Sequence, residues 1–125
     1  AANEIFITQK DIREIQLAKA AIAAGIQILM QEMQIEFTDI EKVYLAGGFG
    51  NYINHGHAME IGLLPAECKG KVIPVGNAAL TGAKMVVKSA EFRESAEKIR
   101  KVAEYIELST RADFQDIFVD NMEFK

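Results

Sequence analysis

The stretch Val43-Tyr44-Leu45-Ala46-Gly47-Gly48-Phe49-Gly50-Asn51-Tyr52-Ile53 decides the fold class, because a short apolar strand runs there into three glycines around one phenylalanine. Glycine is needed where the backbone φ angle is positive, or where a Cβ atom would collide with something lying against the main chain. Two interpretations follow. One is an ordinary tight turn between a strand and a helix. The other is a docking loop for a flat ligand, and this segment alone does not separate the two.

A second strand-glycine-helix unit follows later in the chain. Residues 71–75 predict a short strand, Gly76 and Asn77 a turn, and residues 78–87 a helix. Two such units in succession indicate an α/β architecture. Stable sheets usually have about four to six strands, so we predict that this chain is part of something larger. Its start at Ala1, without methionine, fits a cut fragment and a processed terminus equally.

Helices fill most of the remaining sequence. Thr8 and Asp11 resemble a capping box at the start of a long amphipathic helix that reaches Met33. Its alanine-rich middle either lets another element approach closely or simply favours helix. Residues 58–65 predict a short helix that is stopped by Gly62 and Pro65. A further helix begins after Ser89, and a last one is expected near the C-terminus. Their apolar positions are Phe92, Ala96, Ile99, Ala103 and Ile106 in the former, and Phe114, Ile117, Phe118 and Met122 in the latter.

Composition and charge narrow the class of protein. The 125 residues, 50% of them hydrophobic, suffice for one domain. Acidic residues outnumber basic ones by 18 to 14, and no basic stripe is present, so nucleic acid is not an expected partner. We find no apolar run of about 20 residues and no signal-peptide pattern, so we expect no membrane segment and a cytoplasmic location.

The sequence offers few metal ligands. Cys68 is the single cysteine, so it cannot form an internal disulfide or hold an iron-sulfur cluster alone. His55 and His57 lie two residues apart without a third ligand at suitable spacing, which is more typical of a solvated loop than of a metal site. We therefore predict no metal site here, and any redox centre must lie outside this chain.

Four short motifs, taken together, carry a resemblance to a known family. In chain order they are Leu45-Ala46-Gly47-Gly48-Phe49-Gly50-Asn51-Tyr52-Ile53, Ile61-Gly62-Leu63-Leu64-Pro65, Val75-Gly76-Asn77-Ala78-Ala79-Leu80 with Gly82-Ala83, and Ile106-Glu107-Leu108-Ser109 before Phe114. Each is common alone, but their order resembles the C-terminal part of the reductive activators of corrinoid proteins. The resemblance spans nearly the whole chain.

The resemblance implies both a fold and an activity. Members of this family belong to the actin, sugar-kinase and heat-shock-chaperone ATPase superfamily and carry an added ferredoxin-like domain with a [2Fe-2S] cluster. They couple ATP hydrolysis to the transfer of one electron onto an inactive Co(II) corrinoid protein of a methyl-transfer system. Residues 1–125 would then be a C-terminal nucleotide-binding lobe, or part of one, of an actin-like, ribonuclease H-like α/β fold that is helix-rich with a few short strands.

The resemblance also implies site residues. Gly47, Gly48, Phe49, Gly50 and Asn51 fall on the superfamily's adenosine motif and would bind ATP or ADP, with Mg²⁺ shared with the missing lobe. We assign no catalytic and no metal-binding residue. The chain lacks the second phosphate loop, the catalytic acid and the cluster cysteines, so we do not expect it to hydrolyse ATP alone, and the [2Fe-2S] cluster belongs to the full-length protein only.

Two further expectations stay open at this point. Gly76, Asn77 and Gly82 resemble the superfamily's second connecting motif, where a helix crosses between lobes and permits hinge or shear movement; an ordinary turn and helix start explains them as well. Two alternative functions also remain. One is the nucleotide-binding lobe of a small-molecule kinase of the same superfamily. The other is an interaction module that forms a homodimer through the alanine-rich helix face or through Phe114, Phe118 and Met122.

Overall fold

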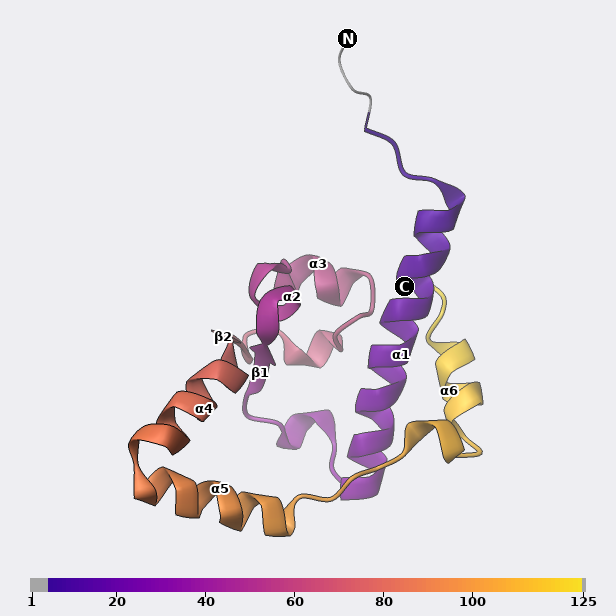
Figure 1. Cartoon of the computed structure of the whole chain (residues 1–125). Helices are drawn as coiled ribbons and strands as arrows, with labels where there is room; N and C mark the ends of the chain where they lie inside the picture. Colours follow the sequence, from indigo (N-terminus) through magenta and orange to yellow (C-terminus); the bar gives the residue numbers. More distant parts are fainter. Residues whose placement is uncertain (1–4, 125) are drawn as a thin grey trace.

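The structure, a computed structural model, describes residues 5–124. Most of the chain is helical, and a single pair of strands lies between a long helix and a helical hairpin (Figure 1). The α-helices and strands are α1 (Gln9–Met33), β1 (Val43–Ala46), α2 (Gly47–Tyr52), α3 (His55–Glu60), β2 (Val72–Gly76), α4 (Ala78–Lys88), α5 (Ala90–Val102) and α6 (Phe114–Asp120). Three short 3-10 helices join them: η1 (Phe37–Asp39), η2 (Ala66–Cys68) and η3 (Leu108–Thr110). This agrees with the expected helix-rich α/β class.

Helix α1 begins where the sequence predicts. The backbone N–H of Asp11 donates to Thr8 Oγ1 at 3.2 Å, and the N–H of Thr8 donates to the Asp11 carboxylate at 2.9 Å. This reciprocal pair satisfies two N–H groups that the helix itself cannot pair. The helix ends at Gln34, which adopts a left-handed conformation with φ 54°. The predicted capping box is confirmed.

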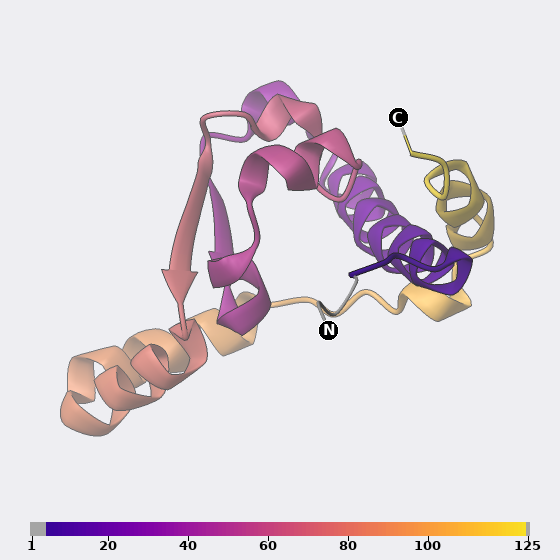
Figure 2. The same ribbon diagram turned by 90° about the horizontal axis from the view of Figure 1, so that it is seen from above.

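The alanine-rich face of α1 is part of the core of this chain. Ala20, Ala23 and Ala24 are buried. The Leu108 side chain lies 3.5 Å from the point where a Cβ atom would stand on Gly25, and α6 runs alongside α1 (Figures 1 and 2). The narrow middle of α1 therefore admits other elements closely. Ala18 and Ala21 of the same segment stay exposed, so a dimer interface on this helix stays a prediction.

Helix α6 supplies the other apolar surface considered for a dimer. Phe114 and Phe118 are half-buried, and their ring centroids lie 5.9 Å apart. Asn121, which is buried, exchanges hydrogen bonds of 3.4 Å with the amide of Gln27 on α1. These contacts place α6 against α1 within the chain, so a homodimer stays a prediction without an identified surface.

The two strands pair in parallel. Val43 lies opposite Val72 and Ala46 opposite Gly76, with an irregularity between Leu45 and Ala46. The side chains of β1 alternate between half-buried and exposed positions. Leu45 packs on a small core with Ala58, Leu63, Leu64 and Ile26. This core ties the sheet to α1, while the other face of β1 stays open.

Helices α4 and α5 form a hairpin that extends away from α1 and α6 in both views (Figures 1 and 2). No residue of either helix is buried among the described residues. Helix α5 begins at the predicted Ser89 cap but ends at Val102, so the predicted continuation to Ile106 is wrong. The chain becomes extended at Ala103 and crosses back to α1, where the contact between Leu108 and Gly25 replaces another helical turn.

Helix α3 also differs from its prediction. It spans His55–Glu60 and begins at the Asn54 cap, whose side chain accepts from the His57 N–H at 3.0 Å. The sequence predicts its start at Ala58, three residues later than the structure has it. The predicted stop at Gly62 agrees with the structure, where this glycine has φ 74° just after the helix. The two histidines therefore lie on a helix and not in a loop. Within residues 5–124, no helix is both long and apolar enough to cross a bilayer.

Candidate functional site

Parallel pairing brings the two glycine turns of the sequence together. Ala46 and Gly76 are partners in the register, so both strands end at the same edge of the sheet. Each strand is followed by a helix, α2 after β1 and α4 after β2, and α2 packs against both strands. Ligands of open parallel sheets commonly bind beyond the carboxyl ends of the strands. The sequence analysis named both turns as candidate functional elements, and the structure places the two turns side by side.

The glycine segment forms a short helix directly after β1, which agrees with the interpretation as a tight turn between a strand and a helix; ligand docking at this segment stays a prediction. Gly47 begins α2 with φ +84°, a conformation that favours glycine. Gly50 is buried, and a Cβ atom added there would stand 3.0 Å from Leu45 Cβ and 3.2 Å from the Leu45 carbonyl carbon. These two glycines are thus explained by the fold, because they let the first turn of α2 lie directly on β1.

Gly48 has no such explanation within the chain. Its φ is not in the left-handed region, it is exposed, and a Cβ atom there would meet nothing within 4 Å among the described residues. Glycine in a helix is less favourable than alanine by roughly 0.5–1 kcal/mol. A glycine that the fold does not require is best explained by something outside this chain that approaches its backbone. Of the five predicted site residues, Gly48 is the strongest candidate for ligand contact.

Exposed aromatic rings lie beside Gly48. Phe49 is 66% exposed and Tyr52 is 88% exposed. Together with Gly48 and Ile53 they line an apolar pocket of about 350 Å³. The sequence analysis included Phe49 among the site residues and left out Tyr52, although their spacing of three places both on one side of a helix. Asn51, the last predicted site residue, is exposed and does not line this pocket.

The second turn has clear local roles. Gly76 has φ +61°, and the Asn77 side chain caps α4 by accepting from the Leu80 N–H at 3.0 Å. The Thr81 hydroxyl donates to the Asn77 carbonyl at 3.1 Å. These contacts explain Gly76 and Asn77 as a turn and helix start. Gly82, in contrast, has open space where a Cβ atom would stand, and the hinge role of these residues stays a prediction.

The described residues offer no metal centre. None of their His, Cys, Asp and Glu side chains form a group of three that could hold a metal ion. Cys68 is buried, and this burial raises the pKa of its thiol, which disfavours the thiolate that an iron-sulfur cluster requires. The described side chains therefore do not suit an iron-sulfur cluster, and nucleotide binding at Gly48 stays a prediction.

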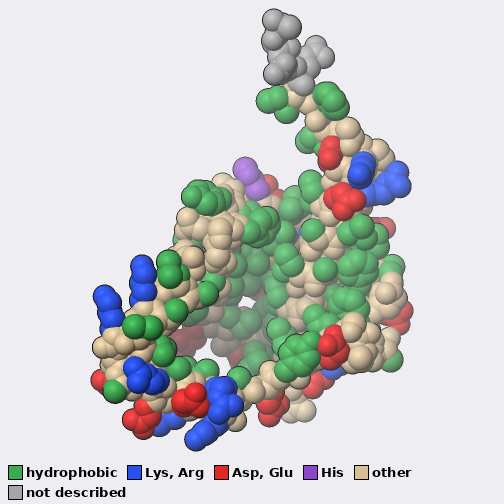
Figure 3. Space-filling model, viewed as in Figure 1, with side chains coloured by type: hydrophobic (Ala, Val, Ile, Leu, Met, Phe, Trp, Pro, Cys, Tyr) green, Lys and Arg blue, Asp and Glu red, His purple; other side chains and the backbone are tan. Residues whose placement is uncertain are grey.

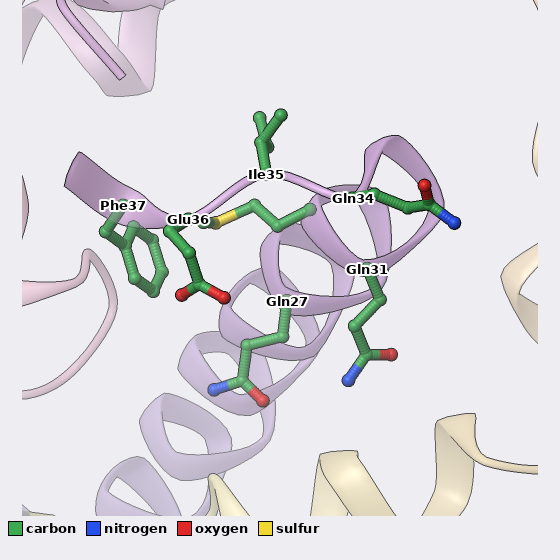
Figure 4. Close-up of a pocket in the computed structure, with 7 residues that line it drawn as sticks. Gln27, Gln31, Gln34, Ile35, Glu36 and Phe37 are labelled. Atoms are coloured by element: carbon green, nitrogen blue, oxygen red, sulfur yellow. The ribbon is translucent and has the colours of Figure 1, made fainter. Parts of the chain in front are cut away.

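Another pocket lies at the end of α1. It has a volume of about 500 Å³ and contains none of the predicted site residues. Its lining consists of Gln27, Met30, Gln31, Gln34, Ile35, Glu36 and Phe37. The side chains of Gln27 and Gln31 extend to one side, whereas Ile35 points away from them (Figure 4). Gln27 is also hydrogen-bonded to Asn121, so its amide belongs to the packing of α1 on α6.

Comparison with known proteins shows which family this chain matches. The whole chain, residues 1–125, matches the family described as the C-terminal domain of RACo, the ASKHA domain. The chain belongs to this RACo family. It is 40% identical over 122 residues to the corrinoid activation enzyme RamQ of Eubacterium limosum, an alignment that covers 98% of this chain and 21% of that relative. It is 28% identical to the [Co(II) methylated amine-specific corrinoid protein] reductase of Methanosarcina barkeri, over 96% of this chain and 22% of that protein.

A solved structure of the RACo family has the same fold. A reductive activator for a corrinoid, iron-sulfur protein superimposes with a TM-score of 0.81 at 37% identity, over 93% of this chain and 18% of that one. The chain thus spans about a fifth of the length of these relatives. The resemblance to reductive activators and the ASKHA-type fold expected from the sequence are both confirmed.

Proposed function

We propose that this chain is the C-terminal nucleotide-binding lobe of an ATP-dependent reductive activator of a corrinoid protein. The observation that carries the proposal is the match of all 125 residues to the RACo C-terminal family. The geometry supports it, because the two strands end side by side at Ala46 and Gly76, and a Cβ atom at the nearby Gly48 would meet nothing within 4 Å among the described residues. Both curated relatives act on corrinoid proteins by name, which favours this function over the small-molecule kinase.

Within such an activator, this chain would hold the adenosine part of ATP or ADP. Gly48 lets the ligand approach the backbone, while Gly47 and Gly50 set the position of α2 on the sheet. In this proposal the missing lobe shares in binding Mg²⁺ and contributes most of the phosphate contacts. The ferredoxin-like domain of the full-length protein would hold the [2Fe-2S] cluster, and that group would supply the electron for Co(II).

The hairpin α4–α5 offers a route for coupling. Helix α4 starts at the same strand edge as the glycine site, and its residues are not buried within the described chain. A nucleotide at that edge therefore lies next to an element that packing within this chain does not hold in place. In this proposal, Gly76 and Gly82 permit α4 to shift when nucleotide binds.

The test uses the full-length protein. It is mixed with a Co(II) corrinoid protein of a methyl-transfer system and a low-potential reductant, and the optical spectrum of Co(I) is followed with and without Mg-ATP. We expect Co(I) to accumulate only with ATP. Consumption of ATP without any Co(I), across the corrinoid proteins of the same organism, would contradict the proposal and favour a kinase.

A further inference from the structure

We infer that a groove along α1 binds an extended peptide segment of the same polypeptide, from outside residues 1–125. This rests on the part of the proposed function by which the chain belongs to a longer activator, and it concerns a surface separate from the nucleotide site. The Gln27 groove, as we name it, consists of two adjoining pockets that share Gln27 and Phe37. One is the pocket at the end of α1. The other lies between α1, the turn at Gly62 and the end of α6.

The shape of the Gln27 groove favours an elongated ligand. The two pockets have volumes of about 500 and 370 Å³, and each alone is in the range of small-molecule sites, roughly 300–1,000 Å³. A ligand that fills both must pass the junction at Gln27 and Phe37. At this junction Glu36 and Phe37 extend to the same side as the glutamines of α1 (Figure 4). An extended chain fits such a space better than a compact molecule.

Carboxamide side chains supply hydrogen-bonding groups along this groove. Gln27 and Gln31 are four residues apart, so both lie on one side of α1, and each can donate and accept as a peptide group does. Two hydrogen bonds join Gln27 to the buried Asn121, and both are 3.4 Å long. Protein hydrogen bonds of this kind are usually roughly 2.7–3.2 Å long. A peptide backbone can therefore replace these long bonds with shorter ones.

The remaining lining is suited to a peptide and not to an anion. Glu36 and Glu67 are exposed beside the groove. Lys19, the cation in the lining, already donates to the backbone carbonyl of Glu123. Apolar side chains such as the buried Met30 form the walls between the polar groups. A bound peptide uses both features, because its backbone pairs with polar groups and its side chains fill apolar pockets.

The length of the relatives indicates where this peptide comes from. The chain spans about a fifth of each relative it matches, so most of an activator of this kind lies outside residues 1–125. A segment tethered to the same molecule by a short flexible linker reaches an effective concentration of roughly millimolar order. A shallow groove with a few hydrogen bonds is then sufficient to hold it. A segment of the corrinoid protein, or of a second copy, lacks this advantage.

The test places the photo-reactive residue p-benzoylphenylalanine at position Gln31 of the full-length protein, because Gln31 is exposed and lies in the groove. The protein is irradiated without a corrinoid protein, and mass spectrometry maps the cross-linked peptides. We expect a cross-link within one molecule to a segment outside residues 1–125. Lys101 is the matched control position, since it is exposed on α5 and outside both pockets. It should not cross-link to that segment.

Hydrogen exchange gives a second measurement on the same protein. Gln31→Leu removes the carboxamide and keeps a side chain of similar size. Amide exchange in the cross-linked segment should become about three- to tenfold faster, which corresponds to the loss of one hydrogen bond. The amides around Ile28, which is buried in α1, are the internal reference and should exchange as in the wild type. Unchanged exchange of the segment would contradict recognition by this carboxamide.

Three cross-linking results would overturn the inference. A cross-link that forms only after the corrinoid protein is added would assign the groove to that partner. A product of doubled mass would assign it to a second copy of the protein. No cross-link from Gln31 to a segment outside residues 1–125 would show that the groove does not hold the polypeptide. ATP-dependent formation of Co(I) in the same preparation would mean that the proposed function stands. A cross-link without any Co(I) would mean the reverse.

Discussion

Two helical regions of this molecule, α1 with α6 and the α4–α5 hairpin, differ in how much of their surface the chain itself buries. Helix α1 buries Ala20, Ala24 and Ile28 completely, and α6 and η3 are joined to it by paired side chains. The α4–α5 hairpin buries no residue within the described chain, and Val87 and Val102 are each 78% exposed. In the space-filling view, hydrophobic side chains border the opening between the two regions (Figure 3).

The difference teaches where this chain is complete and where it depends on something else. Most helical stability in proteins comes from packing of an apolar face. Helix α1 receives that packing within the chain, whereas the hairpin relies on its Asn77 and Ser89 caps and on contacts between its own two helices. The glycine site lies at the strand edge from which α4 of the hairpin starts. A nucleotide there would contact the less firmly held part of the structure.

The largest effect should come from breaking the packing of α1. Replacing Ile28, which has no exposed surface, with alanine should lower the local free energy of unfolding by about 2–5 kcal/mol, because it leaves a cavity. Hydrogen exchange of the α1 amides in the full-length protein measures this value. Val87→Ala on the hairpin is the comparison, with an expected loss below about 0.5 kcal/mol. Equal losses at the two positions would remove the contrast between the regions.

A smaller loss should follow a change at the contact between α2 and the sheet. Gly50→Ala places a Cβ atom 3.0 Å from Leu45 Cβ, so the backbone must move. We expect a destabilisation of about 1–3 kcal/mol, read from the urea midpoint of the full-length protein. An unchanged midpoint would mean that α2 can shift freely on β1, and that the fold does not require this glycine.

The smallest effect concerns the ionic part of the α1–α6 region. Arg111 pairs with Glu32 on α1 and with Asp113, at 2.8 Å from Asp113 Oδ2. The hydrogen bonds from Arg111 lower the pKa of the Asp113 carboxyl below its ordinary value of 3.8. A lowered folded-state pKa contributes stability that is present above the ordinary pKa and is lost as pH falls through the lowered one. The urea midpoint of the wild type should therefore fall below about pH 4 more steeply than that of Asp113→Asn. Identical pH profiles would contradict this role.

The sequence predicts elements best where side chains act locally. The Thr8 capping box, the Asn77 and Ser89 caps and both strand-glycine turns are visible in short stretches, and the structure has all of them. The predictions that were wrong concern features that are set by contacts between residues far apart in the sequence. Helix α5 stops at Val102 because the chain returns to α1, where Leu108 packs on Gly25. The spacing of Ala103 and Ile106 alone could not reveal that contact.

The candidate site follows the same rule. The residue types around Gly48 were visible in the sequence, but their different roles were not. Gly50 is a glycine because Leu45, five positions earlier, lies too close for a Cβ atom once α2 packs on β1. Tyr52 became a candidate site residue only with the structure, which leaves its ring exposed in the lining of the pocket. Parallel pairing of the strands, which aligns Ala46 with Gly76, is a tertiary fact that neither strand encodes alone.

The most direct test of the account is Mg-ATP binding to full-length Gly48→Ala, measured by calorimetry together with its thermal stability. A Cβ atom at Gly48 meets nothing within 4 Å in the described chain, so the fold should keep or slightly raise its stability. The account predicts that ATP affinity nevertheless falls by about tenfold or more, because the methyl group occupies ligand space. A stable Gly48→Ala protein that binds ATP as tightly as the wild type would contradict the central claim that this strand end holds the nucleotide.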